Sequence, residues 1–487
     1  MNRPPRIIAP LLPVAVSMMA GIATGYYHPQ DSLITLLAAI AVLAVATLLG
    51  RHPRWQTAAI WLCCAVGGHW LAARQLQQLR TPPRSHDLIV CSTPVNKGKT
   101  IVMDALTADG KKVRLRMMYG TPVSLGCGLH VSAAIRPVGY YPLYFDSHGY
   151  CGEVFAGYRQ WHPKRVGTGG LSFLQRTRLR LLAVRQQLLE RYRLSGIDRD
   201  VYAVTAAMTL GDKSAISQDL RETFSSTGTS HVLALSGLHL GIVYWLVVLL
   251  TAGRRHSIIV QVATVLAIWA YAFLTGLAPS IVRAALMLSL YSLLAIGHRD
   301  KMSVNALAFA AIAMLTANPL LVFDVGFQLS YAAVLAILLF FPLLNGLVSP
   351  RFLQRHRLAA WLWGMAELST AAQLGTAPLV ACHFGHFTPY FLLSNFVVIP
   401  MAYVIILSAL LLLATRLSLF ATLLSATVTA TISALARMAR LPGALIDGLQ
   451  PSLLEVALLY VIIACLYVLL RNVPYHYLAS YRPAEQK

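Results

Sequence analysis

Long apolar segments fill most of the chain, and one long polar stretch interrupts them after residue 73. Windows of roughly 17 to 25 mostly apolar residues are long enough to cross a bilayer as helices. We therefore expect about twelve membrane spans, three before the interruption and the rest after it. The windows are 7–25, 32–50, 56–73, 231–252, 257–276, 280–297, 303–317, 326–344, 359–381, 389–415, 418–436 and 453–470.

Composition narrows the class of protein. Of the 487 residues, 57% are hydrophobic and only 12% are charged, which excludes an ordinary soluble protein and indicates a polytopic α-helical membrane protein. We expect N-terminal transmembrane helices over 1–73, an extracytoplasmic β domain over 74–165 and amphipathic or linker helices over 166–230. A transmembrane bundle over 231–472 and a cytoplasmic tail over 473–487 follow.

The distribution of Lys and Arg predicts the orientation. Basic residues near Arg3, Arg51, Arg254, Arg351 and Arg471 fall on one side of the expected spans, and short cytoplasmic loops are enriched in such residues. This places both termini in the cytoplasm and the polar insert outside it. The alternative for the first window is a cleavable signal peptide, because basic residues precede it and small residues end it.

The polar insert has the pattern of a small β domain. Short β-like runs over 87–91, 100–105, 111–118 and 129–135 are separated by turn residues, and Asp109-Gly110 between two of them predicts a hairpin. About five short strands suit a small barrel of the oligonucleotide-binding type. The downstream segment 171–194 is a basic amphipathic helix, which is typical of a membrane surface, with direct contact to nucleic acid as the alternative.

The insert is strongly basic. The whole chain carries a net charge of +22, and residues 74–193 hold 19 Lys and Arg against six Asp and Glu. Such a surface favours phosphate, and interleaved aromatic rings stack on unpaired bases. The alternative for the aromatic rings is an interfacial belt or a small β core. The expected single-strand contacts are Lys97, Lys99, Lys111, Lys112, Arg114, Arg116, Tyr144 and Phe145.

Three cysteines in the insert permit a disulfide outside the cytoplasm. Cys127 with Cys151 is the candidate pair and leaves Cys91 over, although spacing does not fix the pairing. The usual catalytic motifs are missing from the sequence. Gly98-Lys99-Thr100 lacks the upstream glycine of a phosphate loop and is expected to be a hairpin turn, and no metal-binding motif is found. We expect a channel or transporter without enzymatic activity, cofactor or metal.

Polar residues inside apolar spans are energetically costly and are candidates for function. Ser236-Gly237 is expected to interrupt a helix, and Arg283 needs a partner, for which Asp324, Gln328 and Ser330 are the candidates. A structural network that holds helices in register uses the same residue types and is the alternative. The full set is Asp212, His231, Ser236, Gly237, His239, Arg283, Asp324, Gln328, Gln373 and Asn395.

Four ordered motifs resemble those of a known family. SHVLALSGLHLGIV, TGLAPSIVRAALM, FDVGFQLSYAAVLAI and QLGTAPL followed by SNFVVIPMAY are similar, in this order, to segments of the ComEC-type competence proteins, inner-membrane channels for DNA uptake. The β insert resembles the oligonucleotide-binding domain of that family. The chain stops soon after the last expected span, and so looks like a short form without the family's C-terminal metallo-β-lactamase-like domain.

The resemblance implies passage of one DNA strand into the cytoplasm during natural transformation, starting from double-stranded DNA outside. It also implies an external DNA receptor, a separate nuclease, a cytoplasmic ATP-driven helicase and membrane lipids as partners. Two hypotheses from other classes compete with the channel. One is a secondary transporter of a small solute or ion, and the other is a scaffold of a membrane assembly.

Overall fold

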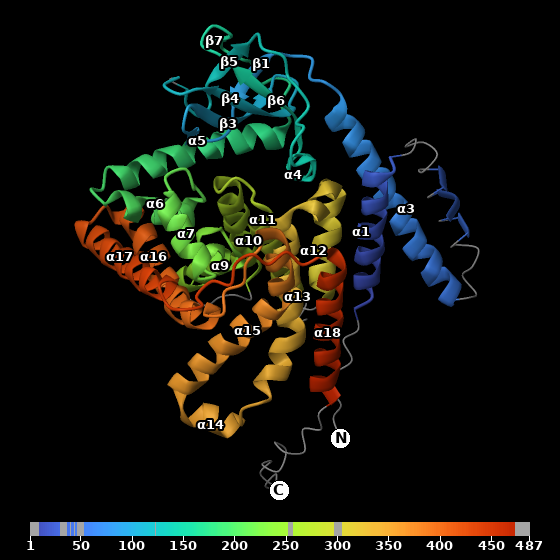
Figure 1. Ribbon diagram of the computed structural model, residues 1–487, viewed down its shortest axis with the longest axis vertical. Coiled ribbons are helices and arrows are strands. Elements are labelled where there is room, and N and C mark those ends of the chain that lie inside the picture. The colour runs from blue at the N-terminus through green and yellow to red at the C-terminus, as the bar shows by residue number, and fades with distance from the viewer. Residues whose placement is uncertain are drawn as a thin grey trace.

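The computed structural model describes residues 9–29, 37–38, 40–42, 44–45, 53–121, 123–251, 257–296 and 304–472. Helices form most of the molecule, and one mixed sheet lies at one end of a helical bundle (Figure 1). Two N-terminal helices stand beside the bundle, and the second of them leads up to the sheet. The sheet is thus an insertion between these helices and the bundle.

The N-terminal helices α1 (Leu11–Tyr27) and α3 (Pro53–Arg80) pack closely on small residues. A Cβ at Gly21 would lie 1.8 Å from the carbonyl oxygen of Ala65, and one at Gly68 would lie 2.4 Å from that of Met18. Only glycine permits this approach, as in other close helix pairs of membrane proteins. The expected span over 32–50 lies largely outside the described residues.

The insert folds as a seven-stranded sheet in which the predicted β runs are confirmed as strands. Asp109-Gly110 forms the expected hairpin turn, with Gly110 at φ +81°, a left-handed conformation that favours glycine. Gly98-Lys99 likewise turns between two paired strands, as predicted. The strands are β1 (Asp87–Val90), β2 (Val95–Lys97), β3 (Thr100–Thr107), β4 (Lys112–Met118), β5 (Gly128–Val131), β6 (Tyr150–Ala156) and β7 (Trp161–Pro163), with α4 (Pro142–Ser147) between β5 and β6.

Strand order follows β6-β4-β3-β1-β5-β7, with β2 paired to β3. Strands β4 and β6 run parallel, whereas the other pairs are antiparallel. Residues alternate along β4, with Val113, Leu115 and Met117 fully buried and the cations between them turned to the other face. This alternation is the pattern of a half-buried strand, and it separates the apolar core of the insert from its basic face.

Helix α5 (Phe173–Arg193) lies between the sheet and the bundle (Figure 1). A capping box starts it: Ser172 Oγ accepts from the Gln175 backbone N–H, and Gln175 Oε1 accepts from that of Ser172. Its apolar face buries Leu189 and Tyr192 among the bundle helices, so the predicted amphipathic helix is confirmed. Its N-terminal half lies against the sheet, where Leu179 packs beside Ile89 and Leu106 and the Gln175 amide donates to Gly110 O at 2.8 Å.

The bundle has helices at the positions that the hydropathy pattern predicts. The expected segment 231–252 is interrupted at Ala234–Ser236 as predicted, because the Ser236 side chain caps a new helix. The helices are α6 (Arg199–Leu210), α7 (Gln218–Ser226), α8 (Ser230–Leu233), α9 (Gly237–Leu250), α10 (Ile258–Leu274), α11 (Pro279–Ile296), α12 (Val304–Ala317), α13 (Val325–Asn345), α14 (Pro350–Arg355), α15 (Arg357–Phe384), α16 (Phe391–Thr415), α17 (Ser418–Ala439) and α18 (Leu453–Asn472), with a short 3-10 turn η1 (Pro319–Phe323) before α13.

Four helices in the described part of the chain, namely α13, α16, α17 and α18, are long and apolar enough to cross a membrane. Helices α1, α9, α10 and α12 are apolar but shorter. Helix α6 is buried along most of its length and packs against α16 and α17. The short basic helix α14 lies at the end of the bundle opposite the sheet (Figure 1).

Candidate functional site

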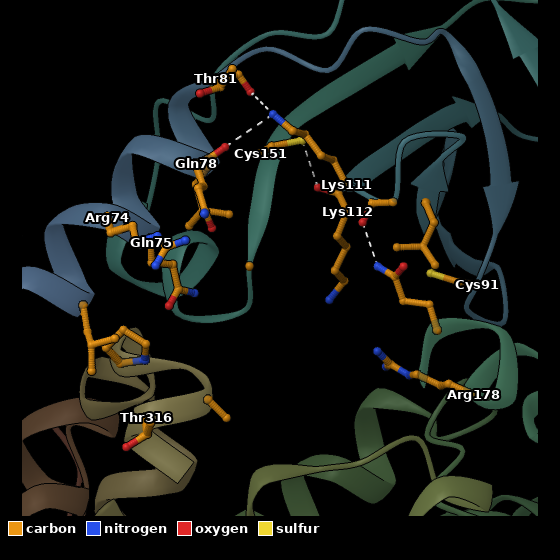
Figure 2. A pocket seen from close by; sticks show the side chains of 18 of the residues that line it. Arg74, Gln75, Gln78, Thr81, Cys91, Lys111, Lys112, Cys151, Arg178 and Thr316 are labelled. Carbon is orange, nitrogen blue, oxygen red and sulfur yellow. Dashed lines mark hydrogen bonds between the residues drawn. The ribbon is translucent and has the colours of Figure 1, made fainter. Parts of the chain in front are cut away.

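A cavity of about 850 Å³ lies where the insert meets the helices. Its walls come from α3, the β3–β4 hairpin, β6, α5 and the junction of α12 with η1, and Figure 2 looks into it. Segments far apart in the sequence therefore build one space between the sheet and the bundle. A cavity of this size is in the range that accommodates one small-molecule-sized group, such as a nucleotide or a lipid headgroup.

The lining carries four cations, Arg74, Lys111, Lys112 and Arg178, and no Asp or Glu. Lys111 is held in place, because its Nζ donates to the carbonyl oxygens of Thr81 at 2.6 Å and Gln78 at 3.4 Å, at the C-terminus of α3. This end of a helix attracts cations. Lys111 thus ties the hairpin to α3 while its charge stays at the cavity wall.

Lys112 is compensated within the insert. Its Nζ lies 3.3 Å from Asp104 Oδ2 and 3.9 Å from the ring centroid of Tyr150. Burial lowers the pKa of Lys112, and the attraction of Asp104 opposes that shift. Lys112 therefore contributes to the cavity as a partly neutralised cation.

The two arginines of the cavity have no such compensation. Neither Arg74 nor Arg178 forms an ion pair with a carboxylate of the described residues. The Arg74 guanidinium stacks over Trp70 at 5.2 Å, and the Nε of Arg178 is buried without a hydrogen-bond partner in the described structure. Both were absent from the predicted contacts, since only the tertiary fold brings α3 and α5 to the same cavity.

The other predicted cations of the insert lie elsewhere. Lys97 and Lys99 are exposed at the β2–β3 turn, away from the cavity. Arg114 donates to the Tyr150 hydroxyl at 3.0 Å and lies 4.7 Å from the Phe145 ring centroid. Arg116 pairs with Glu153 and donates to the Tyr140 hydroxyl. These two arginines therefore have partners within the insert.

The two predicted aromatic contacts differ in exposure. Phe145 is 3% exposed and packs edge-on against Tyr140, Tyr144 and Tyr150, which makes it part of the insert's own packing. Tyr144 is 46% exposed and lies over the His148 ring at 4.3 Å. Only Tyr144 of this pair presents a face to a ligand without rearrangement.

Polar contacts from α4 and from His148, which follows it, attach the insert to α1 and to the bundle. The Tyr26 hydroxyl donates to Asp146 Oδ2 at 3.0 Å, and the Asn318 amide donates to Ser147 O at 3.1 Å. His148 Nε2 lies 3.5 Å from Asp324 Oδ2. Burial lowers the pKa of His148, and the Asp324 carboxylate opposes that shift. These contacts fix the position of the insert on the helices, and each of them joins residues more than 100 positions apart in the sequence.

Asp324 is not the partner of Arg283, and that predicted pairing is wrong. Asp324 Oδ1 instead accepts from the Phe327 backbone N–H at 2.7 Å and caps α13, while its other oxygen faces His148. Arg283 donates from Nη1 to the carbonyl oxygen of Ser330, another of the predicted candidates, six residues further along the chain in α13. Both oxygens of the Asp324 carboxylate are thus engaged by the cap of α13 and by His148.

The break before α9 is built by predicted residues. The backbone N–H of Ser236 donates to His239 Nδ1 at 3.1 Å, and Ser236 Oγ accepts from the Leu238 backbone N–H at 3.3 Å. Gly237 begins α9 beside Arg283, and Ser280 Oγ donates to Leu235 O at 2.6 Å. The starts of α9 and α11 are thereby held next to each other.

The remaining predicted residues are dispersed. Asp212 is buried and accepts from the Ser214 backbone N–H at 3.0 Å, and His231 is exposed at the start of α8. Gln328 donates to Val322 O at 2.9 Å, with His383 Nε2 2.9 Å from its Oε1, whereas Asn395 donates to Ser369 Oγ at 3.2 Å. Gln373 lies half-buried on α15. The polar candidates therefore occupy several places along the bundle and do not form one cluster.

The predicted Cys127–Cys151 disulfide is not present, because both thiols are free. Cys127 Sγ lies 3.1 Å from Ser124 Oγ before β5, whereas Cys151 Sγ donates to Lys112 O at 3.2 Å on β6 and faces the cavity. Burial raises the pKa of Cys151 to about 11, which keeps the thiol protonated and unreactive at neutral pH.

Comparisons with known proteins bear on the helical part of the chain. The family model described as "Competence protein" matches residues 208–473. The chain is 27% identical over 263 residues to "ComE operon protein 3" of Bacillus subtilis, covering 53% of this chain and 32% of that protein. It is 30% identical over 221 residues to an "Uncharacterized protein" of Aquifex aeolicus, covering 45% of this chain and 49% of the relative.

A shorter match, 24% identical over 147 residues, is to "Uncharacterized protein YcaI" of Escherichia coli and covers 20% of that protein. The chain thus spans less than half the length of each of these relatives. No solved structure matches. The family model covers more than half of the 487 residues and the motif residues of α8 to α16, and the chain is a membrane protein that belongs to the ComEC-type competence protein family.

Proposed function

We propose that this protein takes part in competence DNA uptake as an inner-membrane channel that passes single-stranded DNA to the cytoplasm. The observation that carries the proposal is the basic cavity between the insert and the bundle, which holds four cations and no carboxylate. A polyanion entering a low-dielectric bundle needs cations or neutral donors along its way, and it is repelled by carboxylates.

We also propose that the insert is a barrel of the oligonucleotide-binding type. Strand β1 pairs with β3 and β5, β3 pairs with β4, and β4 runs parallel to β6, which is the pairing scheme of that fold. A bridge between Arg136, which follows β5, and Glu153 of β6 supports closure of the barrel. Such domains bind single strands through basic grooves and exposed rings.

The proposed topology has about twelve spans, with the insert outside the cytoplasm and both termini inside. Two features support it. The basic helix α14, with Arg351 and Arg355, lies at the end of the bundle opposite the insert (Figure 1), where the distribution of basic loops predicts the cytoplasm. The glycine-packed helices α1 and α3 lead from the bundle side to the insert.

In this proposal the insert receives the strand outside the membrane, the cavity holds its phosphates, and the bundle passes it on. The protein itself performs no chemistry on the DNA. An external receptor, a separate nuclease and a cytoplasmic ATP-driven helicase would supply capture, strand removal and pulling. Membrane lipids surround the bundle.

The test follows fluorescent double-stranded DNA in cells that lack this chain and carry either the intact gene or a variant. Arg178→Gln removes a cavity cation, and Arg180→Gln is the matched control, because Arg180 is exposed on the same helix and does not line the cavity. We expect label to stay outside the inner membrane in the deletion strain and with Arg178→Gln, and to enter with Arg180→Gln.

Protein levels of the variants are compared by immunoblot, so that loss of the protein is distinguished from loss of passage. Normal entry of label in the deletion strain would overturn the channel proposal and leave the small-solute transporter or the scaffold. Normal entry of label in cells that carry Arg178→Gln would show that the cavity does not take part in DNA passage.

A further inference from the structure

The start of α9 has an unusual electrostatic environment. The first backbone N–H groups of a helix have no intrahelical acceptor and carry a positive partial charge. In α9 this end begins at Gly237 inside the apolar bundle, directly after the break at Ala234–Ser236. The Ser236 hydroxyl accepts from the Leu238 N–H and, in a capping box, from the His239 N–H, but the Gly237 N–H has no such cap and no acidic side chain lies in the first turn.

A buried arginine faces this positive helix end. Arg283 is 7% exposed, and its Nη2 lies 3.8 Å from the position that a Cβ at Gly237 would occupy. Its Nη1 donates to Ser330 O and its guanidinium stands 5.9 Å from the Tyr331 ring centroid. Its Nε is buried without a partner, and no carboxylate of the described residues forms an ion pair with it.

Two positive groups that face each other in an apolar bundle are unfavourable without an anion. A buried guanidinium is costly unless it is paired, and the helix end adds to that cost. The same geometry is favourable once an anion lies between them, because a backbone N–H group at a helix start and an arginine fork both bind phosphate. The glycine keeps the space beside the arginine free of a side chain.

We infer that the start of α9, together with Arg283, is an anion site for a phosphodiester group. The donors are the guanidinium Nη2 and Nε and the backbone N–H of Gly237, because the Ser236 hydroxyl already accepts from the next two N–H groups of α9. Ser280 Oγ, bonded to Leu235 O, holds the start of α11 against the break and so keeps Arg283 in place. That the ligand is the DNA backbone rests on the proposed function, whereas the anion site itself does not.

The test uses the full chain purified in a phosphate-free maltoside detergent. Its thermal unfolding midpoint is measured against sodium dimethyl phosphate, with sodium chloride at equal ionic strength as reference. All proteins carry Arg178→Gln, which weakens anion binding in the cavity. We expect the phosphodiester to raise the midpoint, because a ligand that binds only the folded state stabilises it.

Three substitutions distinguish the site. Arg283→Gln removes the cation, and Gly237→Ala fills the space with a methyl group that meets Ala284 at 3.6 Å and Arg283 at 3.8 Å, both ordinary contacts. Gly241→Ala, one turn along α9 with nothing within 4 Å, is the matched control. We expect the apparent affinity to fall about tenfold or more in the first two and to stay unchanged in the control.

A second series replaces dimethyl phosphate with a five-residue oligothymidylate or with short-chain phosphatidylglycerol. Stabilisation by the oligonucleotide that depends on Arg283 assigns the site to DNA. Stabilisation by the lipid alone assigns it to a headgroup, overturns the DNA assignment and leaves the uptake test above unaffected. No stabilisation of the parent protein by any of the three ligands, or full stabilisation with Arg283→Gln, would overturn the anion site.

Discussion

Several cations of the insert form ion pairs with carboxylates, whereas the buried cation Arg283 of the bundle has no carboxylate partner among the described residues. In the insert, Arg116 pairs with Glu153, Lys112 with Asp104 and Lys164 with Asp87. In the bundle, Arg283 is buried and has only a carbonyl oxygen and a ring as described partners. The cavity lies between these extremes, with Arg74 and Arg178 free of ion pairs to described carboxylates.

The comparison teaches that a local excess of charge does not identify binding residues. The 19 Lys and Arg of residues 74–193 include several that are neutralised by their neighbours in the fold. A cation already paired gains less from a phosphate, because the existing pair has to be broken first. The residues available to a polyanion are those that the fold leaves unpaired.

The largest expected effect separates free from paired cations. The double substitution Arg74→Gln with Arg178→Gln should weaken binding of a single-stranded oligonucleotide by the full chain more than tenfold. It should also reduce the slope of log affinity against log salt by about 1.4, since each phosphate contact on a single strand contributes about 0.7. Fluorescence anisotropy over a salt series measures both quantities.

The matched control is Arg114→Gln with Arg116→Gln, which removes the same charge from the paired set. It should change affinity less than threefold. Equal losses of affinity in the two double variants would show that ion pairing within the insert does not affect binding, and would contradict the distinction between free and paired cations.

The junction between the two regions gives the next effect. Asp324→Ala removes the N-cap of α13 and the contact to His148, and should lower the stability of the folded chain by about 1 to 2 kcal/mol. Asp324→Asn keeps a capping oxygen and should lose less than half of that. Thermal unfolding of both variants in detergent measures the difference, and equal losses would assign the whole effect to the His148 contact.

A smaller effect is expected for an ion pair within the insert. Arg116→Leu should lower stability by at most about 1 kcal/mol, because the Arg116 side chain is 38% exposed and solvent screens its pair with Glu153. Hydrogen exchange of the β4 and β6 amides in the full chain is the measurement. A loss of protection in α9 or α11 of the same size would contradict a local role.

The smallest expected effect is a change in the stability of the fold at acidic pH. Hydrogen bonds from Lys164 and from His130 hold the pKa of Asp87 below its usual range. A carboxyl group with a lowered folded-state pKa stabilises the fold above its unfolded pKa of about 3.9, and that contribution is lost as the pH falls further. Below about pH 4, the thermal unfolding midpoint should therefore fall less steeply with decreasing pH in Asp87→Asn than in the parent chain. Parallel curves would exclude this role.

Much of the local structure was predictable. The β runs, the Asp109-Gly110 hairpin and the helix break at Ser236-Gly237 follow from alternation, turn chemistry and capping, which depend on neighbouring residues. The hydrogen-bonding and ion-pair partners of the buried polar side chains were predicted less well. Ser330 was correctly among the three candidates for Arg283, whereas Asp324, another candidate, faces His148 instead.

The sequence by itself determined the class of the molecule: a membrane protein with apolar helices and a basic β insert, whose ordered motifs belong to the competence family. Hydropathy and turn signals act over a few residues, so they are readable along the chain. Only the tertiary structure decided which charges are neutralised, that His148 meets Asp324 across 176 positions, and that Arg74 and Arg178 line one cavity. Electrostatic and hydrogen-bonding partners depend on distance in space, and no local pattern encodes a contact between segments that only folding brings together.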